Sequence, residues 1–212
     1  LPEYRMVCVT LDGFHPDSDE FESLEQQTEK LVHMLQDRGT TDFELVIGLS
    51  MGTIFAVRLA KHPSLHIKKL LLDGAVNFYR SKYKPVVHAA IYLIFSYFMK
   101  TSGDKERSIR DLGKVYGGDW PEIQYICRTS LTKPSLRVIA KLLADYKLEP
   151  GVTQPMYLLY GGDEDNVQTN SKVVKELYPD AKISVKPGYN HLAFLNREPV
   201  EYGKIVRKIL DR

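Results

Sequence analysis

Short apolar runs alternate with amphipathic segments over the first third of the chain. Runs rich in β-branched and aliphatic residues at 5–11, 43–47 and 67–72 predict three buried strands. A capping-box pattern at 23–26 predicts the start of one helix, and the apolar spacing of 52–61 predicts another. Each helix falls between two strands, an order that is typical of a mostly parallel sheet with helices on both faces.

The same alternation returns in the last third of the chain. Residues 155–160 and 183–185 predict two further strands, and residues 171–177 lie in a predicted helix between them. An amphipathic helix is expected from 199 to 210. The two ends of the chain therefore predict one α/β sheet to which both contribute.

The middle of the chain has a different character. Residues 79–148 show four helical patterns, many aromatic side chains and no convincing strand. Their longest apolar run, 86–99, is shorter than the roughly 20 residues that span a bilayer. We therefore expect an α/β core made of residues 1–78 and 149–212. Residues 79–148 are expected to be inserted into it as a helical cap that lines an apolar pocket and has no membrane span.

Composition narrows the class of protein. A chain of 212 residues is long enough for one domain with an inserted subdomain. The formal net charge of +2 is too small to indicate a nucleic-acid partner. Cys8 and Cys127 lie in apolar or helical runs, so we expect them to be buried and free in a cytoplasmic protein, with a disulfide as the alternative. No residue spacing suggests a metal site.

The strongest chemical signal is the segment Gly48-Leu49-Ser50-Met51-Gly52. It has the G-x-S-x-G pattern of a sharp turn that exposes a strained serine between a strand and a helix. The segment follows the predicted strand 43–47 and precedes the predicted helix 52–61, as the pattern requires. We predict that Ser50 is a nucleophile and that the Met51 N–H contributes to an oxyanion hole.

A nucleophilic serine needs a base and a group that orients the base. Of the six histidines, His191 follows the last predicted strand, which places it at the same sheet edge as Ser50. The turn after the preceding strand supplies three carboxyl groups, on Asp163, Glu164 and Asp165. The residues by themselves leave the choice among these three open.

These motifs resemble those of the α/β-hydrolase superfamily over nearly the whole chain. Residues 48–52 match the nucleophile elbow of that family, and 187–191 match its Pro-Gly-x-x-His loop. The acid turn of the family, Gly-x-x-Asp-x-Val, fits residues 162–167, which selects Asp165 as the catalytic acid and leaves Asp163 as the fallback. The resemblance also implies the chain order Ser, Asp, His and a helical cap.

The function that this resemblance implies is hydrolysis of an ester, thioester or related acyl bond in a small molecule. Ser50 would attack the carbonyl, His191 would take its proton and Asp165 would orient the imidazole, with no cofactor and no metal. The same residues would also suit peptide or carbon–carbon bond cleavage or acyl transfer. A hydrolase fold with little activity, used for binding, is the alternative of another class.

Two features depart from the family pattern. The turn at 12–15 keeps only one of the glycines expected there, Gly13. The first three strands of the family, and the loop that donates the second oxyanion N–H, have no counterpart. Because the missing third strand belongs at the centre of the sheet, we expect about 30 to 60 further N-terminal residues in the natural protein. A strand from another chain or a rearranged strand would be the alternative.

Overall fold

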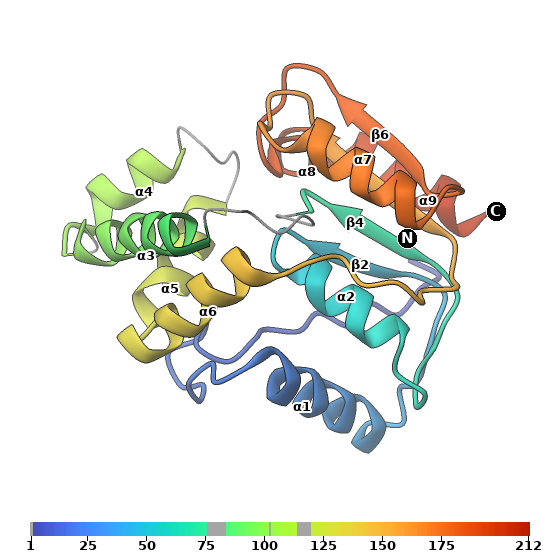
Figure 1. Cartoon of the computed structure of the whole chain (residues 1–212), viewed down its shortest axis with the longest axis horizontal. Coiled ribbons are helices and arrows are strands. Elements are labelled where there is room, and N and C mark those ends of the chain that lie inside the picture. Colours follow the sequence, from blue (N-terminus) through green and yellow to red (C-terminus); the bar gives the residue numbers. More distant parts are fainter. Residues whose placement is uncertain (1, 76–83, 102, 114–119) are drawn as a thin grey trace.

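The computed structural model describes residues 2–75, 84–101, 103–113 and 120–212 and contains a parallel sheet flanked by helices (Figure 1). The four main strands pair in the order β2-β4-β5-β6, and every pair is parallel. Their bounds are β2 Val46–Leu49, β4 Leu70–Asp73, β5 Met156–Gly161 and β6 Lys182–Lys186. The predicted mostly parallel sheet with helices on both faces is therefore confirmed.

Nine helices lie in the described part of the chain. They are α1 Leu24–Asp37, α2 Gly52–Ala60, α3 Lys84–Thr101, α4 Lys105–Gly113, α5 Trp120–Ser130, α6 Lys133–Asp145, α7 Val167–Leu177, α8 Ala193–Arg197 and α9 Pro199–Leu210. The Ser23 hydroxyl accepts a hydrogen bond from the Gln26 N–H at 3.0 Å, so the predicted capping residue begins α1. Among these helices, none is both long enough and apolar enough to cross a bilayer.

Two of the predicted strands are each divided into two short pieces. The run 43–47 becomes β1, Asp42–Phe43, and β2, while the run 67–72 becomes β3, His66–Ile67, and β4. β1 pairs with β3 in parallel. After a gap of two residues in each segment, β2 pairs with β4 in the same register. The division therefore leaves the relative direction and order of the strands unchanged.

Alternate residues of the strands pack into two different layers of the core. Leu70 and Leu72 of β4 contact the layer that contains buried residues of α1 and α2. Leu71, between them, contacts the layer that contains Tyr202 and Val206 of α9. This alternation follows from the two-residue repeat of a strand, and the continuous apolar sequence of β4 reflects burial on both faces.

The predicted strand at 5–11 is wrong. No strand is formed there, Met6 is 73% exposed and Cys8 is also exposed, although Val7 and Leu11 pack against the core. A strand needs a neighbour to bond its amides and carbonyls, and no described segment pairs with these residues. The expected burial of Cys8 fails for the same reason. Both cysteines are free, and Cys127 is partly buried.

The middle of the chain is helical, as the sequence predicts. In the described part of 84–148, α3 to α6 are helices and no strand occurs. The contacts of these helices are largely with one another, α3 with α6 and α4 with α5. Residues 79–83, 102 and 114–119 of the predicted cap lie outside the described residues. That this segment covers the active site stays a prediction.

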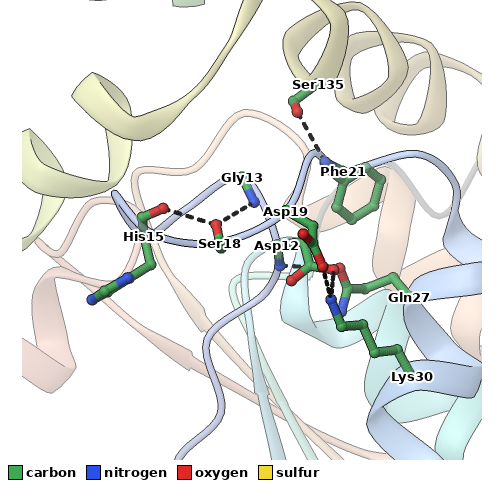
Figure 2. A network of polar contacts seen from close by, with 9 residues as sticks. All are labelled: Asp12, Gly13, His15, Ser18, Asp19, Phe21, Gln27, Lys30 and Ser135. Atoms are coloured by element: carbon green, nitrogen blue, oxygen red, sulfur yellow. Dashed lines mark hydrogen bonds and ion pairs between the residues drawn. The ribbon is translucent and has the colours of Figure 1, made fainter.

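A polar network fastens the loop after residue 11 to two helices that are distant in sequence (Figure 2). Lys30 of α1 lies 2.8 Å from the Asp12 carboxylate and 2.6 Å from that of Asp19. At the other end of the loop, the Phe21 N–H donates to the Ser135 hydroxyl of α6 at 2.9 Å, in a buried contact. The ion pairs are partly exposed and stabilise the fold little, whereas the buried bond cannot be replaced by water.

Replacing Ser135 with alanine tests this attachment. Ser135 is fully buried, so Ser135→Ala leaves the buried Phe21 N–H without its acceptor and should lower the free energy of unfolding by about 1–3 kcal/mol. Urea denaturation measures the difference. The matched control is Ser130→Ala on α5, because among the described residues that hydroxyl bonds to a carbonyl of its own helix, Ile126, and should matter much less. Equal stability of the two variants would contradict the attachment.

Candidate active site

Ser50 occupies a sharp turn between β2 and α2. Its backbone φ of 51° is in the left-handed region, which a serine adopts only under strain. Two interactions hold the turn. The Ser50 N–H donates to the Asp73 carbonyl at 2.8 Å, and the Thr53 hydroxyl donates to the Ser50 carbonyl at 2.6 Å. The predicted strand–turn–helix context of the serine is therefore present.

The two glycines of the motif have different roles. A Cβ atom at Gly48 would lie 2.6 Å from the Gly52 carbonyl oxygen and 2.7 Å from the Thr53 Cα, so a side chain at 48 would push α2 away from β2. A Cβ at Gly52 would meet nothing within 4 Å among the described residues. Close packing therefore explains the first glycine of the pattern and leaves the second unexplained.

His191 lies against Ser50, as the sequence predicts. Its Nε2 is 2.9 Å from the Ser50 Oγ, and its side chain is 28% exposed. The imidazole also packs on Gly74, the first residue after β4, whose φ is +58°. A Cβ at Gly74 would lie 2.7 Å from the His191 Cε1, so the backbone there leaves just enough room for the ring.

The loop that carries His191 is anchored on both sides. The Tyr189 carbonyl accepts the Asp163 N–H at 3.1 Å, which ties the loop to the turn after β5. The Tyr189 ring packs edge-to-face on Phe194 at 5.2 Å between centroids, and Phe194 belongs to the core layer beneath α9. The position of the imidazole is thus set by the sheet edge and by the core.

The carboxylate that contacts His191 belongs to Glu164. Its Oε2 lies 2.8 Å from the His191 Nδ1, and its Oε1 accepts the Gly161 N–H at 2.7 Å. Only 4% of the Glu164 side chain is exposed. The Glu164 side chain folds back over the end of β5. One carboxylate oxygen bonds to the strand backbone and the other contacts the imidazole, so the carboxylate is held between them.

The expected contact between Asp165 and His191 is absent, and so is the fallback contact from Asp163. Both aspartates are exposed residues of the turn, while Glu164 between them points inward. The family pattern was counted from Gly162, but the acid lies three residues after Gly161, the last residue of β5. The predicted strand ends one residue earlier, at 160, so counting three residues from its end would select Asp163, and the sequence carries no signal that selects Glu164.

A second carboxyl group, which no sequence pattern singles out, lies near the same histidine. Asp73 ends β4, is only 3% exposed, and its Oδ2 has no hydrogen-bond partner. Burial, helped by the charge of Glu164, raises the pKa of Asp73 to about 7, against the lowering effect of Tyr202, His191 and the Gly74 N–H. The Tyr202 hydroxyl lies beside Asp73 but makes no well-formed hydrogen bond with it.

The assembled residues form one hydrogen-bonded series at the carboxyl edge of the sheet. Hydroxyl, imidazole and carboxylate in this order can move a proton from the serine to the histidine and produce a nucleophile. Met51, directly before α2, makes no backbone N–H bond to a residue that the structure describes. Within the same ranges, no cluster of three or more His, Cys, Asp or Glu side chains could hold a metal ion.

The chain is similar to solved structures of other proteins. No protein-family model matches the sequence, and no curated protein matches it. The chain is similar in structure to an α/β-hydrolase family protein from Desulfitobacterium hafniense, at a TM-score of 0.67 and 20% identity, over 94% of this chain and 82% of the other.

Two further structures differ from the first in their stated activities. A bromoperoxidase from Bacillus anthracis has a TM-score of 0.70 at 15% identity and covers 95% of this chain and 79% of its own. An esterase from Exiguobacterium antarcticum has a TM-score of 0.67 at 19% identity and covers 94% and 79%. Identities this low establish a shared fold and leave the reaction open. Together with the parallel sheet and the strained serine turn, they show that this chain has the α/β-hydrolase fold.

Proposed function

We propose that this protein is a serine hydrolase that cleaves an ester, thioester or related acyl bond of a small molecule. The observation that carries the proposal is the uninterrupted series from the Ser50 Oγ through His191 to Glu164, with contacts of 2.9 and 2.8 Å. Each contact has the length that proton transfer between positioned groups requires. The strained turn at Ser50 presents the hydroxyl toward the imidazole.

The first step is attack of the Ser50 Oγ on the carbonyl carbon of the substrate, while the His191 Nε2 takes the hydroxyl proton. For this the Nδ1 of His191 must carry a proton, and this N–H donates a hydrogen bond to the Glu164 carboxylate, which stays ionised. The imidazolium then protonates the leaving group, and an acyl-enzyme remains on Ser50. His191 next takes a proton from water, which attacks the acyl carbonyl, and the imidazolium then returns that proton to the Ser50 Oγ as the acid leaves.

The negative oxygen that forms in both steps needs hydrogen-bond donors. The Met51 N–H is suited to this role because it follows the nucleophile and lies at the N-terminal end of α2. One donor of this kind typically contributes about 10²- to 10³-fold to the rate. A second donor is not assigned.

The class of bond is inferred from the site and from one similarity. The esterase from Exiguobacterium antarcticum has the same fold, which supports an acyl substrate for this chain. Peptide or carbon–carbon bond cleavage and acyl transfer would use the same three residues. A binding protein with little activity is the alternative of another class, and it differs from the proposal in the reactivity of Ser50.

The two carboxyl groups near His191 have different parts in the proposal. Glu164 bonds to the Nδ1 and therefore orients the ring. Asp73 makes no such bond, and its burial favours the neutral form at pH values where an exposed aspartate is ionised. We therefore assign the orienting role to Glu164 and treat Asp73 as a buried acid that affects stability.

Labelling with a fluorophosphonate probe tests the nucleophile. The native protein should react covalently at Ser50, and Ser50→Ala should abolish both labelling and ester hydrolysis, with a loss of about 10⁴-fold or more in kcat/KM. Ser184→Ala, at an exposed position of β6, is the matched control and should retain labelling. A folded native protein that does not react with the probe would support the binding alternative, and full activity in Ser50→Ala would refute the mechanism.

Substitutions in the turn after β5 test the acid. Glu164→Gln keeps the size of the side chain but removes the charge that stabilises the imidazolium, so kcat should fall by about 10³-fold or more. Asp165→Asn and Asp163→Asn are matched controls at exposed positions and should change kcat by no more than about twofold. A large loss in Asp165→Asn together with a small loss in Glu164→Gln would reverse the assignment.

The buried carboxyl group of Asp73 should make stability depend on pH. From about pH 4 to about pH 7 the unfolded chain has lost the Asp73 proton while the native protein retains it, so a rise in pH across this window favours unfolding. Asp73→Asn removes the titrating group. The unfolding free energy of the variant relative to the native protein should therefore rise by up to about 4 kcal/mol across the window. Denaturant titrations at several pH values measure this difference, and parallel pH curves would contradict it.

A further inference from the structure

An apolar surface extends along the outer side of α3. Four large side chains of this helix are strongly exposed: Val86 at 67%, Leu93 at 65%, Ile94 at 53% and Tyr97 at 60%. Val86, Leu93 and Tyr97 follow one another at intervals of seven and four residues, which aligns them on one side of a helix. Exposed Ala89 and Ala90 fill the space between them. We call this set of six residues the α3 face.

The opposite side of α3 is the one that packs on the protein. Val87, His88, Ile91 and Tyr92 are all partly buried, and the helix contacts α6 and α5. α5 itself exposes Ile123 and Ile126, each at 48%. Half of the large hydrophobic residues that are exposed in the described chain therefore belong to α3 and α5. An apolar surface of this extent that is exposed to water marks a site of contact with another protein or with a membrane.

The position of the face agrees with such a contact. α3 and α4 form the part of the molecule farthest from α9 and the C-terminal end in Figure 1. From 85 to 99 the sequence holds no lysine, arginine, aspartate or glutamate, and lysines stand at both ends, Lys84 and Lys100. Because no described helix is suited to cross a bilayer, a helix with such a face would lie in the plane of a lipid surface.

Charge distinguishes a lipid surface from a second copy of the chain. Residues 79–148 hold thirteen Lys and Arg against six Asp and Glu, whereas the rest of the chain holds sixteen against twenty-one. The nearly neutral chain thus has a basic middle segment and an acidic remainder. α4, which contacts α3, exposes Lys105, Arg107 and Arg110 together with Glu106 and Asp111, so the positive balance belongs to the segment as a whole rather than to α4 alone. Two α3 faces meeting in a dimer would bring two basic segments together, while anionic lipid headgroups would be complementary to one.

We propose that the α3 face docks this protein on an anionic lipid surface. The apolar side chains enter the boundary between headgroups and acyl chains, and the surrounding basic residues contact the negatively charged headgroups. The contact is independent of the hydrolase reaction proposed above, because none of its residues belongs to the series from Ser50 to Glu164. It would hold the protein at a membrane without inserting a spanning helix.

Co-sedimentation with vesicles tests the proposal. The full chain should bind vesicles of equal parts phosphatidylcholine and phosphatidylglycerol, bind vesicles of phosphatidylcholine alone much more weakly, and be released by salt. The double variant Val86→Gln, Leu93→Gln should lower the partition coefficient on the anionic vesicles by about tenfold or more. Val200→Gln is the matched control, because Val200 is 71% exposed on α9, outside this face, and should leave binding unchanged.

Other outcomes would overturn the proposal. No binding to the anionic vesicles, equal binding to both kinds of vesicle, or equal loss in the Val200→Gln control would each exclude the α3 face as an anionic-lipid contact. A dimer in sedimentation equilibrium that the double variant abolishes, without vesicle binding, would assign the face to a second copy instead. Circular dichroism of the double variant shows whether it remains folded, and Ile94→Gln provides a single substitution on the same face if it does not.

Discussion

The hydrogen bond from the Ser50 N–H to the Asp73 carbonyl is the constraint on which the site depends. It extends the parallel pairing of β2 and β4 by one residue beyond the end of β2, at 2.8 Å. The strained φ of Ser50 is tolerated because this bond, the Thr53 hydroxyl and the close contact of α2 at Gly48 all restrain the same turn. The next residue after Asp73 is Gly74, and the imidazole of His191 packs against its backbone.

The parallel register brings the remaining groups to the same place. β4 pairs with β5 and β5 with β6, so the carboxyl ends of all four strands meet at one edge. The turn after β5 supplies Glu164 there, and the loop after β6 supplies His191. Segments separated by more than 100 residues thereby supply three side chains that contact one another in series. The parallel direction of the strands is the reason that loops, rather than the sheet itself, hold the residues of the candidate site.

Two parts of the molecule lie in environments that are unusual for their side chains: a carboxyl group that is buried and a helix whose apolar residues are exposed. Glu164 is enclosed and has a hydrogen-bond partner at each oxygen, while the Oδ2 of Asp73 is enclosed without one, and burial raises the pKa of Asp73. On the surface, α3 exposes aliphatic side chains at positions where a helix that faces water carries polar ones. The first departure lies beside the candidate active site and the second lies away from it, and each is costly unless it has a role.

The sequence by itself determined the order of strands and helices, the strained turn at Ser50 and the loop that carries His191. Those features depend on neighbouring residues: the alternation of apolar runs, the glycine required at 48 and the cap at Ser23. Only the tertiary structure decided which of three adjacent carboxyl groups faces His191, because one residue along a turn reverses the direction of a side chain. It also decided that residues 5–11 form no strand, since strand formation needs a bonding partner that lies elsewhere in the fold. The buried position of Asp73 and the exposed face of α3 likewise depend on what packs against each side chain, which the local pattern does not contain.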